Sequence, residues 1–113
     1  MLQSPVIRSV NISEKKGEVK SPCERIQLTT LGIEGDAHSG PWHRQVSLLA
    51  LESIRDYEQT TNTTVLPGGF GENITTEGLV LHELRPLDQF TCRDVVLEVT
   101  QIGKKCHGTG CAI

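Results

Sequence analysis

Val95-Val96-Leu97-Glu98-Val99-Thr100-Gln101-Ile102 is the longest stretch rich in β-branched residues in the chain. Branched side chains pack well on a pleated, half-buried surface, so this stretch predicts a strand over residues 95–102. The strand leads directly to Gly103-Lys104-Lys105-Cys106-His107. Neighbouring lysines favour the thiolate form of a cysteine, which attacks electrophiles, carries sulfur or binds a soft metal. The sequence therefore predicts a chemically active Cys106 after a rigid strand.

The rest of the chain consists mainly of short stretches with the pattern of strands. Alternating or apolar runs predict strands over residues 4–12, 24–30, 46–49, 74–76 and 79–81. The first two are expected to form a hairpin-like element. Apolar residues at helical spacing, with charges between them, predict one amphipathic helix over residues 51–60. About six short strands, one helix and no βαβ rhythm favour a compact, mostly β barrel.

Length and charge restrict the class of protein. A chain of 113 residues can bury one hydrophobic core but not two, so residues 1–113 are expected to form a single domain. A net charge of -3 does not suit the basic face of a nucleic-acid-binding protein. The sequence contains neither the roughly 20 apolar residues of a membrane span nor the apolar core of a signal peptide. We expect a cytoplasmic protein that binds neither nucleic acid nor membranes.

The four cysteines are Cys23, Cys92, Cys106 and Cys111. In a reducing cytosol they are expected to be free thiols, and the first two are expected to act as small buried hydrophobic residues. Cys106 and Cys111, together with His107, also allow a zinc-site interpretation. Structural zinc sites take their ligands in two closely spaced pairs, and the second pair is missing here. Zinc is therefore the weaker interpretation.

Residues 32–44 form a loop rich in glycine, histidine and charged residues. Glycines let backbone N–H groups approach an anion, and Arg44 can donate two hydrogen bonds to a phosphate or carboxylate. Alternatively, Asp36 and His38 bond to the backbone of their own loop, as such residues do in many turns. The spacing alone does not separate these two roles.

A second glycine-rich loop, Gly68-Gly69-Phe70-Gly71, precedes Glu72 and Asn73. It lacks the spacing of a dinucleotide-binding motif and the lysine of a P-loop, so it gives little support to nucleotide binding. The Asn73 side chain can offer a donor and an acceptor to a site. Capping of a turn is the structural alternative, and the sequence slightly favours it.

Four blocks of this sequence together resemble MOSC domains, the family named for the C-terminal domain of molybdenum cofactor sulfurase. The blocks keep the family's order and spacing over nearly the whole chain, and they are most similar to small stand-alone bacterial members that also occur fused to molybdopterin-processing enzymes. The resemblance implies a β-barrel with a few short helices. The four blocks are GIEGDAH (32–38), HRQVSLL (43–49), PGGFGENI (67–74) and VTQIGKKCH (99–107).

The resemblance also implies a function. Family members are thought to bind the molybdenum cofactor or to carry sulfur to it, and the cysteine of their late strand motif falls on Cys106. That thiolate would ligate molybdenum or hold a persulfide, because soft sulfur ligands suit both, and His107 would orient a ligand or tune the thiol. The residues implied to hold the pterin ring and phosphate of molybdopterin are Glu34, Gly35, Asp36, His38 and Arg44, with Asn73 opposite them.

Two alternative functions stay open at this point. Some larger relatives use the bound cofactor to reduce N-hydroxylated compounds, and such a reductase would need an electron-donor partner because this chain has no flavin, haem or iron–sulfur motif. A non-catalytic zinc or structural module is the other alternative. For a sulfur carrier, the expected partners are molybdenum cofactor biosynthesis enzymes or a sulfur donor. Pyridoxal phosphate is expected only on a separate sulfurase partner.

The sequence departs from the family pattern in two places. Stand-alone members usually continue beyond Cys111-Ala112-Ile113 with a further cysteine and a final barrel strand, so we expect a domain truncated at its C-terminus. The open sheet edge would then favour a homodimer. The second departure is Cys92-Arg93, where relatives commonly have a glycine. This change affects the turn more than the chemistry.

Overall fold

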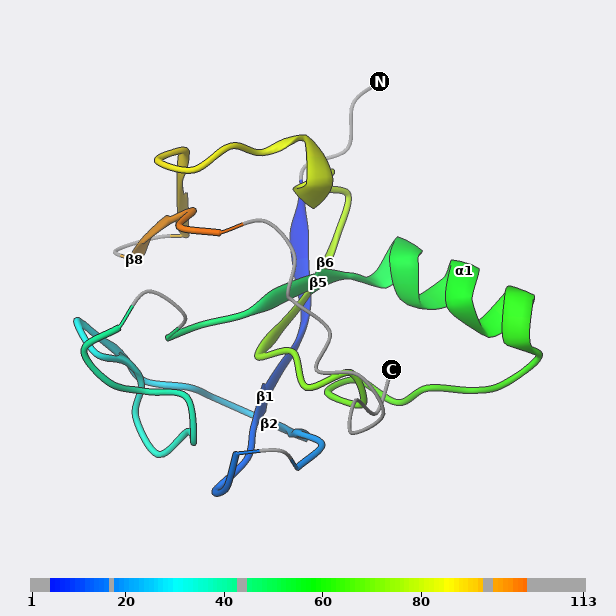
Figure 1. Cartoon of the computed structure of the whole chain (residues 1–113), viewed down its shortest axis with the longest axis horizontal. Helices are drawn as coiled ribbons and strands as arrows, with labels where there is room; N and C mark the ends of the chain where they lie inside the picture. The colour runs from blue at the N-terminus through cyan, green and yellow to red at the C-terminus, as the bar shows by residue number, and fades with distance from the viewer. Residues whose placement is uncertain (1–4, 17, 43–44, 93–94, 102–113) are drawn as a thin grey trace.

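The computed structural model describes residues 5–16, 18–42, 45–92 and 95–101. Figure 1 shows α1 projecting to one side of the central strands, with the β7–β8 hairpin on another side. The elements in chain order are β1 (Val6–Ile12), β2 (Ser21–Cys23), β3 (Leu28–Thr29), β4 (Gly32–Ile33), β5 (Leu48–Ala50), α1 (Leu51–Thr61), β6 (Ile74–Glu77), the 3-10 helix η1 (Leu81–Glu83), β7 (Gln89–Cys92) and β8 (Val95–Glu98).

The largest sheet has four strands in the order β2-β1-β6-β5. Strand β1 is antiparallel to both β2 and β6, and its register with β6 shifts between Ile7 and Ser9. The pairs β3–β4 and β7–β8 form two further antiparallel sheets. The prediction of a mostly β protein with one α-helix is therefore confirmed for the described residues. These residues form separate sheets and no closed barrel, so the barrel stays a prediction.

Strands β5 and β6 are parallel, and α1 connects them. A parallel pair needs a crossover connection, so this segment is a single βαβ unit, which the sequence patterns did not predict. The predicted helix is confirmed: Ile54 is buried on its inner face, and Asn62 ends the helix in the left-handed region at φ 54°. No described helix is long and apolar enough to cross a membrane.

Two predicted strands differ from the structure. The interval 24–30 is not one strand, because β1 takes Ser21–Cys23 as its hairpin partner and Leu28–Thr29 pairs with β4. A hairpin is present after β1 as expected, but its second strand is Ser21–Cys23, before the predicted interval. The predicted strand over residues 79–81 is absent: Gly78, at φ 86°, follows β6, and Leu81 begins η1.

The predicted strand over residues 95–102 is shorter in its described part. Strand β8 covers only Val95–Glu98 and pairs with β7, which the sequence patterns did not predict. Two further bonds, Leu87 N to Val99 O at 2.7 Å and Val99 N to Asp88 O at 2.8 Å, extend this pairing to the turn that precedes β7. Cys23 and Cys92 are free thiols, as expected. Their predicted burial was wrong, because Cys23 is half-buried and Cys92 is exposed.

The described interior is unusually polar. Its buried apolar residues are Ile33, Ala50, Ile54 and Ile74, and its buried polar residues are Asn11, Ser13, Lys20, Asp36, Glu72, Asn73, Thr75 and Thr76. Buried polar groups need hydrogen-bond partners, because an unpaired group loses its hydration without compensation. The positions of the loops around the main sheet therefore depend on specific polar contacts.

Gly68 brings the second glycine-rich loop against the β1–β2 hairpin. A Cβ atom at this position would lie 2.3 Å from the backbone oxygen of Lys20 and 3.1 Å from the Cβ of Asn11. The backbone N–H of Lys20 donates to the Gly68 oxygen at 2.9 Å. Glycine is required here both by this close approach and by a φ of 84°.

We expect Gly68→Ala to destabilise the fold more than Gly71→Ala. Both glycines have positive φ values, 84° and 82°, so each alanine carries a left-handed backbone cost of about 1–2 kcal/mol. Only Gly68→Ala adds a steric clash, because nothing lies within 4 Å of a Cβ at Gly71. Urea unfolding of the two variants measures the difference, and equal unfolding free energies would contradict the described packing.

Candidate functional site

A fully buried ion pair joins Lys20 and Asp36. Lys20 Nζ lies 2.8 Å from Asp36 Oδ1, and the exposed fraction of both side chains is 0%. The same ammonium group contacts Ser13 Oγ at 3.1 Å and His38 Nδ1 at 3.1 Å. An ammonium group has three N–H donors and no acceptor, so these three contacts use its whole hydrogen-bonding capacity.

The Asp36 carboxylate also accepts hydrogen bonds from the backbone. Ser13 N donates to Oδ1 at 3.0 Å, and His38 N donates to Oδ2 at 3.0 Å. Burial raises the pKa of the Asp36 carboxyl, but the hydrogen bond from Lys20 lowers it. The two backbone amides and the Asn73 side chain lower it further, and the resulting pKa is below the usual value of an aspartic acid.

The cluster of Ser13, Lys20, Asp36 and His38 connects three segments of the chain. Ser13 follows β1, Lys20 precedes β2, and Asp36 lies in the loop after β4. The backbone bond from Ala37 N to Ser13 O, at 2.8 Å, holds the same segments together. No sequence pattern indicates the role of Lys20, because a lysine in a polar turn normally extends into solvent.

Asn73 connects β6 to two other parts of the main sheet. Its side-chain Oδ1 accepts from Ser47 N at 3.0 Å, and its Nδ2 donates to Asn11 O at 3.1 Å. Its neighbour Glu72 accepts from Gly68 N at 3.1 Å and from the Thr75 hydroxyl at 2.7 Å. The Glu72 side chain therefore holds the second glycine-rich loop in place, as the capping alternative predicted. The Asn73 side chain does not cap that turn and instead joins β1 to the segment before β5.

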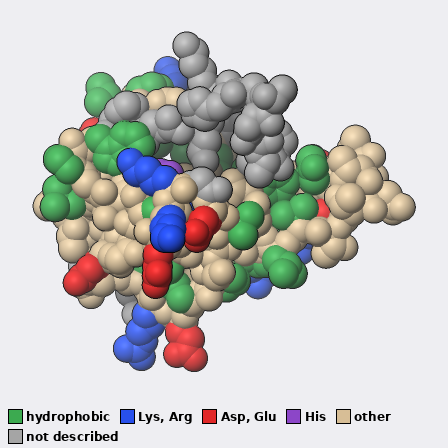
Figure 2. Space-filling view, turned by 60° about the horizontal axis from the view of Figure 1, so that its bottom comes forward, with side chains coloured by type: hydrophobic (Ala, Val, Ile, Leu, Met, Phe, Trp, Pro, Cys, Tyr) green, Lys and Arg blue, Asp and Glu red, His purple; other side chains and the backbone are tan. Residues whose placement is uncertain are grey.

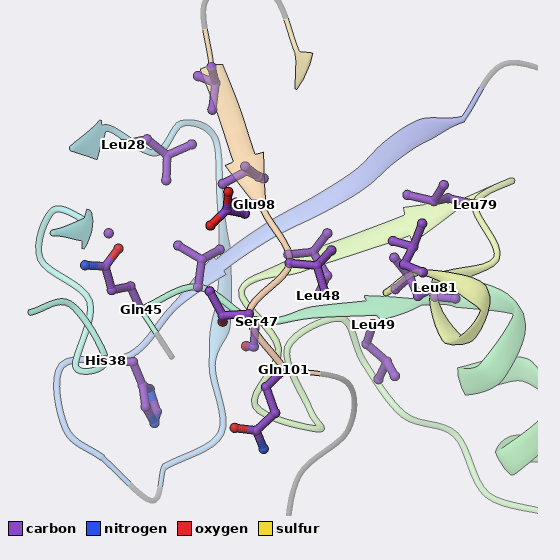
Figure 3. Close-up of a pocket in the computed structure, with 18 of the residues that line it drawn as sticks. Leu28, His38, Gln45, Ser47, Leu48, Leu49, Leu79, Leu81, Glu98 and Gln101 are labelled. Carbon is purple, nitrogen blue, oxygen red and sulfur yellow. The ribbon is translucent and has the colours of Figure 1, made fainter. Parts of the chain in front are cut away.

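A pocket of about 1240 Å³ lies beside this cluster. Figure 3 shows His38, Gln45, Ser47 and Gln101 toward one end, while Leu49, Leu79 and Leu81 lie toward the other. The pocket therefore has polar side chains at the His38 end and leucines toward η1, where the Glu52 carboxylate also accepts from Gly78 N at 2.8 Å. Its lining comes from residues 28–30, 32, 38, 42, 45–50, 52, 53 and 56 and from the segments around η1 and β8.

Trp42 and Gln45 shape the loop at the polar end of the pocket. The Trp42 ring stacks on His38 with centroids 6.2 Å apart and planes 10° apart, and its Nε1 donates to His38 O at 2.7 Å. Gln45 Nε2 donates to Gly40 O at 2.6 Å and to Thr30 O at 3.0 Å. Lys16 Nζ lies 4.8 Å from the Trp42 ring centroid, a cation–π distance. These contacts fix the loop that presents His38.

The outer surface combines charged and apolar groups. Figure 2 shows one face on which hydrophobic side chains are interspersed with acidic and basic ones. The most exposed large apolar residues are Leu66 and Leu87, at 73% and 76%. They lie outside the pocket lining.

The structure brings some of the predicted site residues together. Asp36 contacts His38, and the Asn73 side chain contributes to the environment of Asp36. Glu34 and Gly35 are exposed and do not line the pocket. The predicted residues outside the described part of the chain are Arg44, Cys106 and His107.

A family model described as the MOSC domain matches residues 35–113, which is more than half of the chain. The chain belongs to the MOSC domain family. MOSC domains are associated with molybdenum cofactor binding and sulfuration. No curated protein matches the sequence.

The fold of this MOSC domain is also similar to a solved structure, that of the YuaD protein from Bacillus subtilis. The TM-score is 0.62 and the sequence identity is 19%, so the similarity shows a shared fold. The comparison covers 74% of this chain and 59% of the YuaD chain. This MOSC domain thus matches less than two thirds of that longer protein.

We expect the Lys20–Asp36 pair to be strongly coupled in the stability of the MOSC domain. Lys20→Met alone leaves a buried carboxylate without its cation, which costs about 3–5 kcal/mol. Asp36→Asn alone leaves a buried ammonium, whereas the double variant removes both charges together. In a double-mutant cycle measured by urea unfolding, the double variant is expected to lose much less than the sum of the single losses. Additive losses would contradict the coupling.

We expect acid to weaken the MOSC domain partly through Asp36. Because the folded-state pKa of Asp36 is lowered, its ionised form stabilises the fold above the unfolded pKa of about 3.9. That contribution is lost as the pH falls below about 4 and through the folded pKa. Urea midpoints between neutral pH and acid should fall less steeply for Lys20→Met/Asp36→Asn than for the wild type. Parallel profiles would contradict this assignment.

Proposed function

We propose that this chain binds the molybdenum cofactor or carries sulfur to it, with Cys106 as the molybdenum ligand or the persulfide carrier. The observation that carries this proposal is the pocket whose polar end collects His38, Gln45, Ser47 and Gln101 in a member of the MOSC family. This pocket supports a ligand-binding site, because contacts with Lys20 and Trp42 hold His38 in place at its polar end. In this function, the partners are enzymes that make or sulfurate the cofactor.

The connectivity of the chain supports the role of Cys106. Gln101 lines the polar end of the pocket, and Cys106 follows it by five residues. A segment of that length reaches at most about 17 Å when fully extended. The connecting segment is therefore long enough for the Cys106 thiol to contact a ligand at the polar end of the pocket. Lys104 and Lys105, next to it in the sequence, favour its thiolate form.

The described lining of the pocket does not itself supply the positive charge that an anionic cofactor needs. The described lining includes the carboxylates of Glu52, Asp56 and Glu98 and contains no lysine or arginine. These carboxylates would repel an anion, so its binding requires a cation from elsewhere in the chain. In this proposal Arg44, which precedes the lining residue Gln45, supplies the positive charge for the pterin phosphate.

Each site residue then has a defined task. The Lys20–Asp36 pair and the Trp42 ring hold His38 at the polar end of the pocket, while Asn73 holds the strands beneath it. The Cys106 thiolate would bind the molybdenum or the transferable sulfur, because both are soft partners for a thiolate. The bound cofactor would supply a molybdenum centre, and the protein would supply its binding, its orientation and a shielded pocket.

We expect molybdenum and pterin to copurify with the wild-type protein from molybdate-supplemented cells and to be lost from Cys106→Ser. Cys92→Ser is the matched control, because Cys92 is a free, exposed thiol in the β7–β8 hairpin. Elemental analysis for molybdenum and zinc, with fluorimetric pterin analysis, gives the loading per chain. Unfolding curves establish that all three proteins are folded.

The sulfur-carrier form of the proposal has its own readout. After incubation with a cysteine desulfurase and cysteine, alkylation and mass spectrometry should detect a persulfide on Cys106 and none on Cys92. Zinc in place of molybdenum would favour the metal-module alternative. A folded wild type with neither molybdenum nor a Cys106 persulfide would refute the proposed function.

A further inference from the structure

The contact between Lys20 and His38 restricts the chemistry of the imidazole ring. Lys20 Nζ lies 3.1 Å from His38 Nδ1, and an ammonium group can only donate. Nδ1 must therefore accept, so it carries no proton. A neutral imidazole that accepts at Nδ1 carries its proton on Nε2.

The other states of His38 conflict with the same contact. A proton on Nδ1 would direct one N–H donor at another. A doubly protonated ring would also bring a second positive charge to within 3.1 Å of a buried ammonium. Asp36 Oδ2 lies 3.8 Å from Nδ1, and Asp36 is already bound to Lys20 and to two backbone amides.

Lys20 cannot easily turn away from His38. Its side chain is fully buried, Asp36 and Ser13 bind its other two N–H donors, and its backbone is held against Gly68. The ring of His38 is likewise held by stacking on Trp42. The side chain of His38 is 29% exposed and lines the polar end of the pocket.

We infer that Lys20 is a positioning residue that fixes His38 as a neutral donor with its proton on Nε2. Any ligand group that contacts Nε2 must then be a hydrogen-bond acceptor, such as an oxygen atom. His38 cannot act there as a base through Nε2. The identity of that ligand rests on the proposed function, whereas the state of the ring does not.

The state of the ring can be read without a cofactor. Two-bond ¹H–¹⁵N correlation spectra of ¹⁵N-histidine-labelled protein at pH 7.5 distinguish the two neutral tautomers from imidazolium. The chain has four histidines, and the His38 signals are assigned by their loss in His38→Gln. We expect His38 to show only the tautomer with its proton on Nε2. Signals of the other tautomer or of imidazolium would overturn the inference.

A charge-balanced variant tests whether Lys20 is the cause. Lys20→Met/Asp36→Asn removes both charges, and its His38 signals are expected to shift to the average of two exchanging tautomers. Lys15→Met is the matched control, because Lys15 is an exposed lysine in the same loop between β1 and β2 and should leave the His38 signals unchanged. Unchanged His38 signals in the folded double variant would overturn the role of Lys20.

The donor role of His38 is tested by two substitutions of equal size. Glutamine and glutamate at position 38 can each accept a hydrogen bond from Lys20, but only glutamine can donate a second one into the pocket. We expect His38→Gln to keep molybdenum loading within about twofold of the wild type and His38→Glu to reduce it about tenfold or more. Equal loading of the two folded variants would overturn the donor role.

The outcomes separate this inference from the proposed function. If the wild type carries neither molybdenum nor a persulfide, the proposed function fails, and the spectra still decide the state of His38. If Cys106→Ser alone abolishes loading and His38 shows the other tautomer, the proposed function stands and the role of Lys20 fails.

Discussion

The buried Lys20–Asp36 ion pair is the contact on which the arrangement of the loops depends. Moving both charges out of water is costly, and the cost is recovered only when the remaining donors and acceptors are paired. Here Ser13, His38 and two backbone amides complete the pairing. Because these groups come from three separate segments, the pair can form in only one mutual arrangement of those segments. The buried charges thus specify the geometry as well as contribute to stability.

The same contacts connect the fold to the candidate site. Asp36 holds Lys20, Lys20 contacts the His38 ring, and His38 lines the pocket. Asn73 performs a parallel task in the main sheet, where it connects Ser47 and Asn11. Polar side chains that were candidates for ligand binding are therefore also part of the interior. The His38 imidazole is therefore held rigidly, because Lys20 and Asp36, which contact it, are buried and paired.

Local patterns predicted several elements whose apolar residues follow a regular helical or strand period. Spacing of apolar residues was sufficient for α1, and alternation or short apolar runs were sufficient for β1, β5 and β6. The patterns failed over residues 24–30 and 79–81, where hairpin pairing and Gly78 at φ 86° outweigh β propensity. They also missed the βαβ unit, because the direction of strand pairing is decided by distant contacts.

The sequence by itself determined the family resemblance, a mostly β composition, one helix, and the two glycine-rich loops that contain Asp36, His38 and Asn73. The tertiary structure alone decided that Lys20 is buried and that it determines which nitrogen of His38 can donate. It also decided that Asn73 joins strands that are distant in the chain. The physical reason is separation along the sequence: Lys20 and Asp36 lie 16 residues apart, and Asn11 and Asn73 lie 62 apart. No local periodicity records contacts between such distant polar side chains.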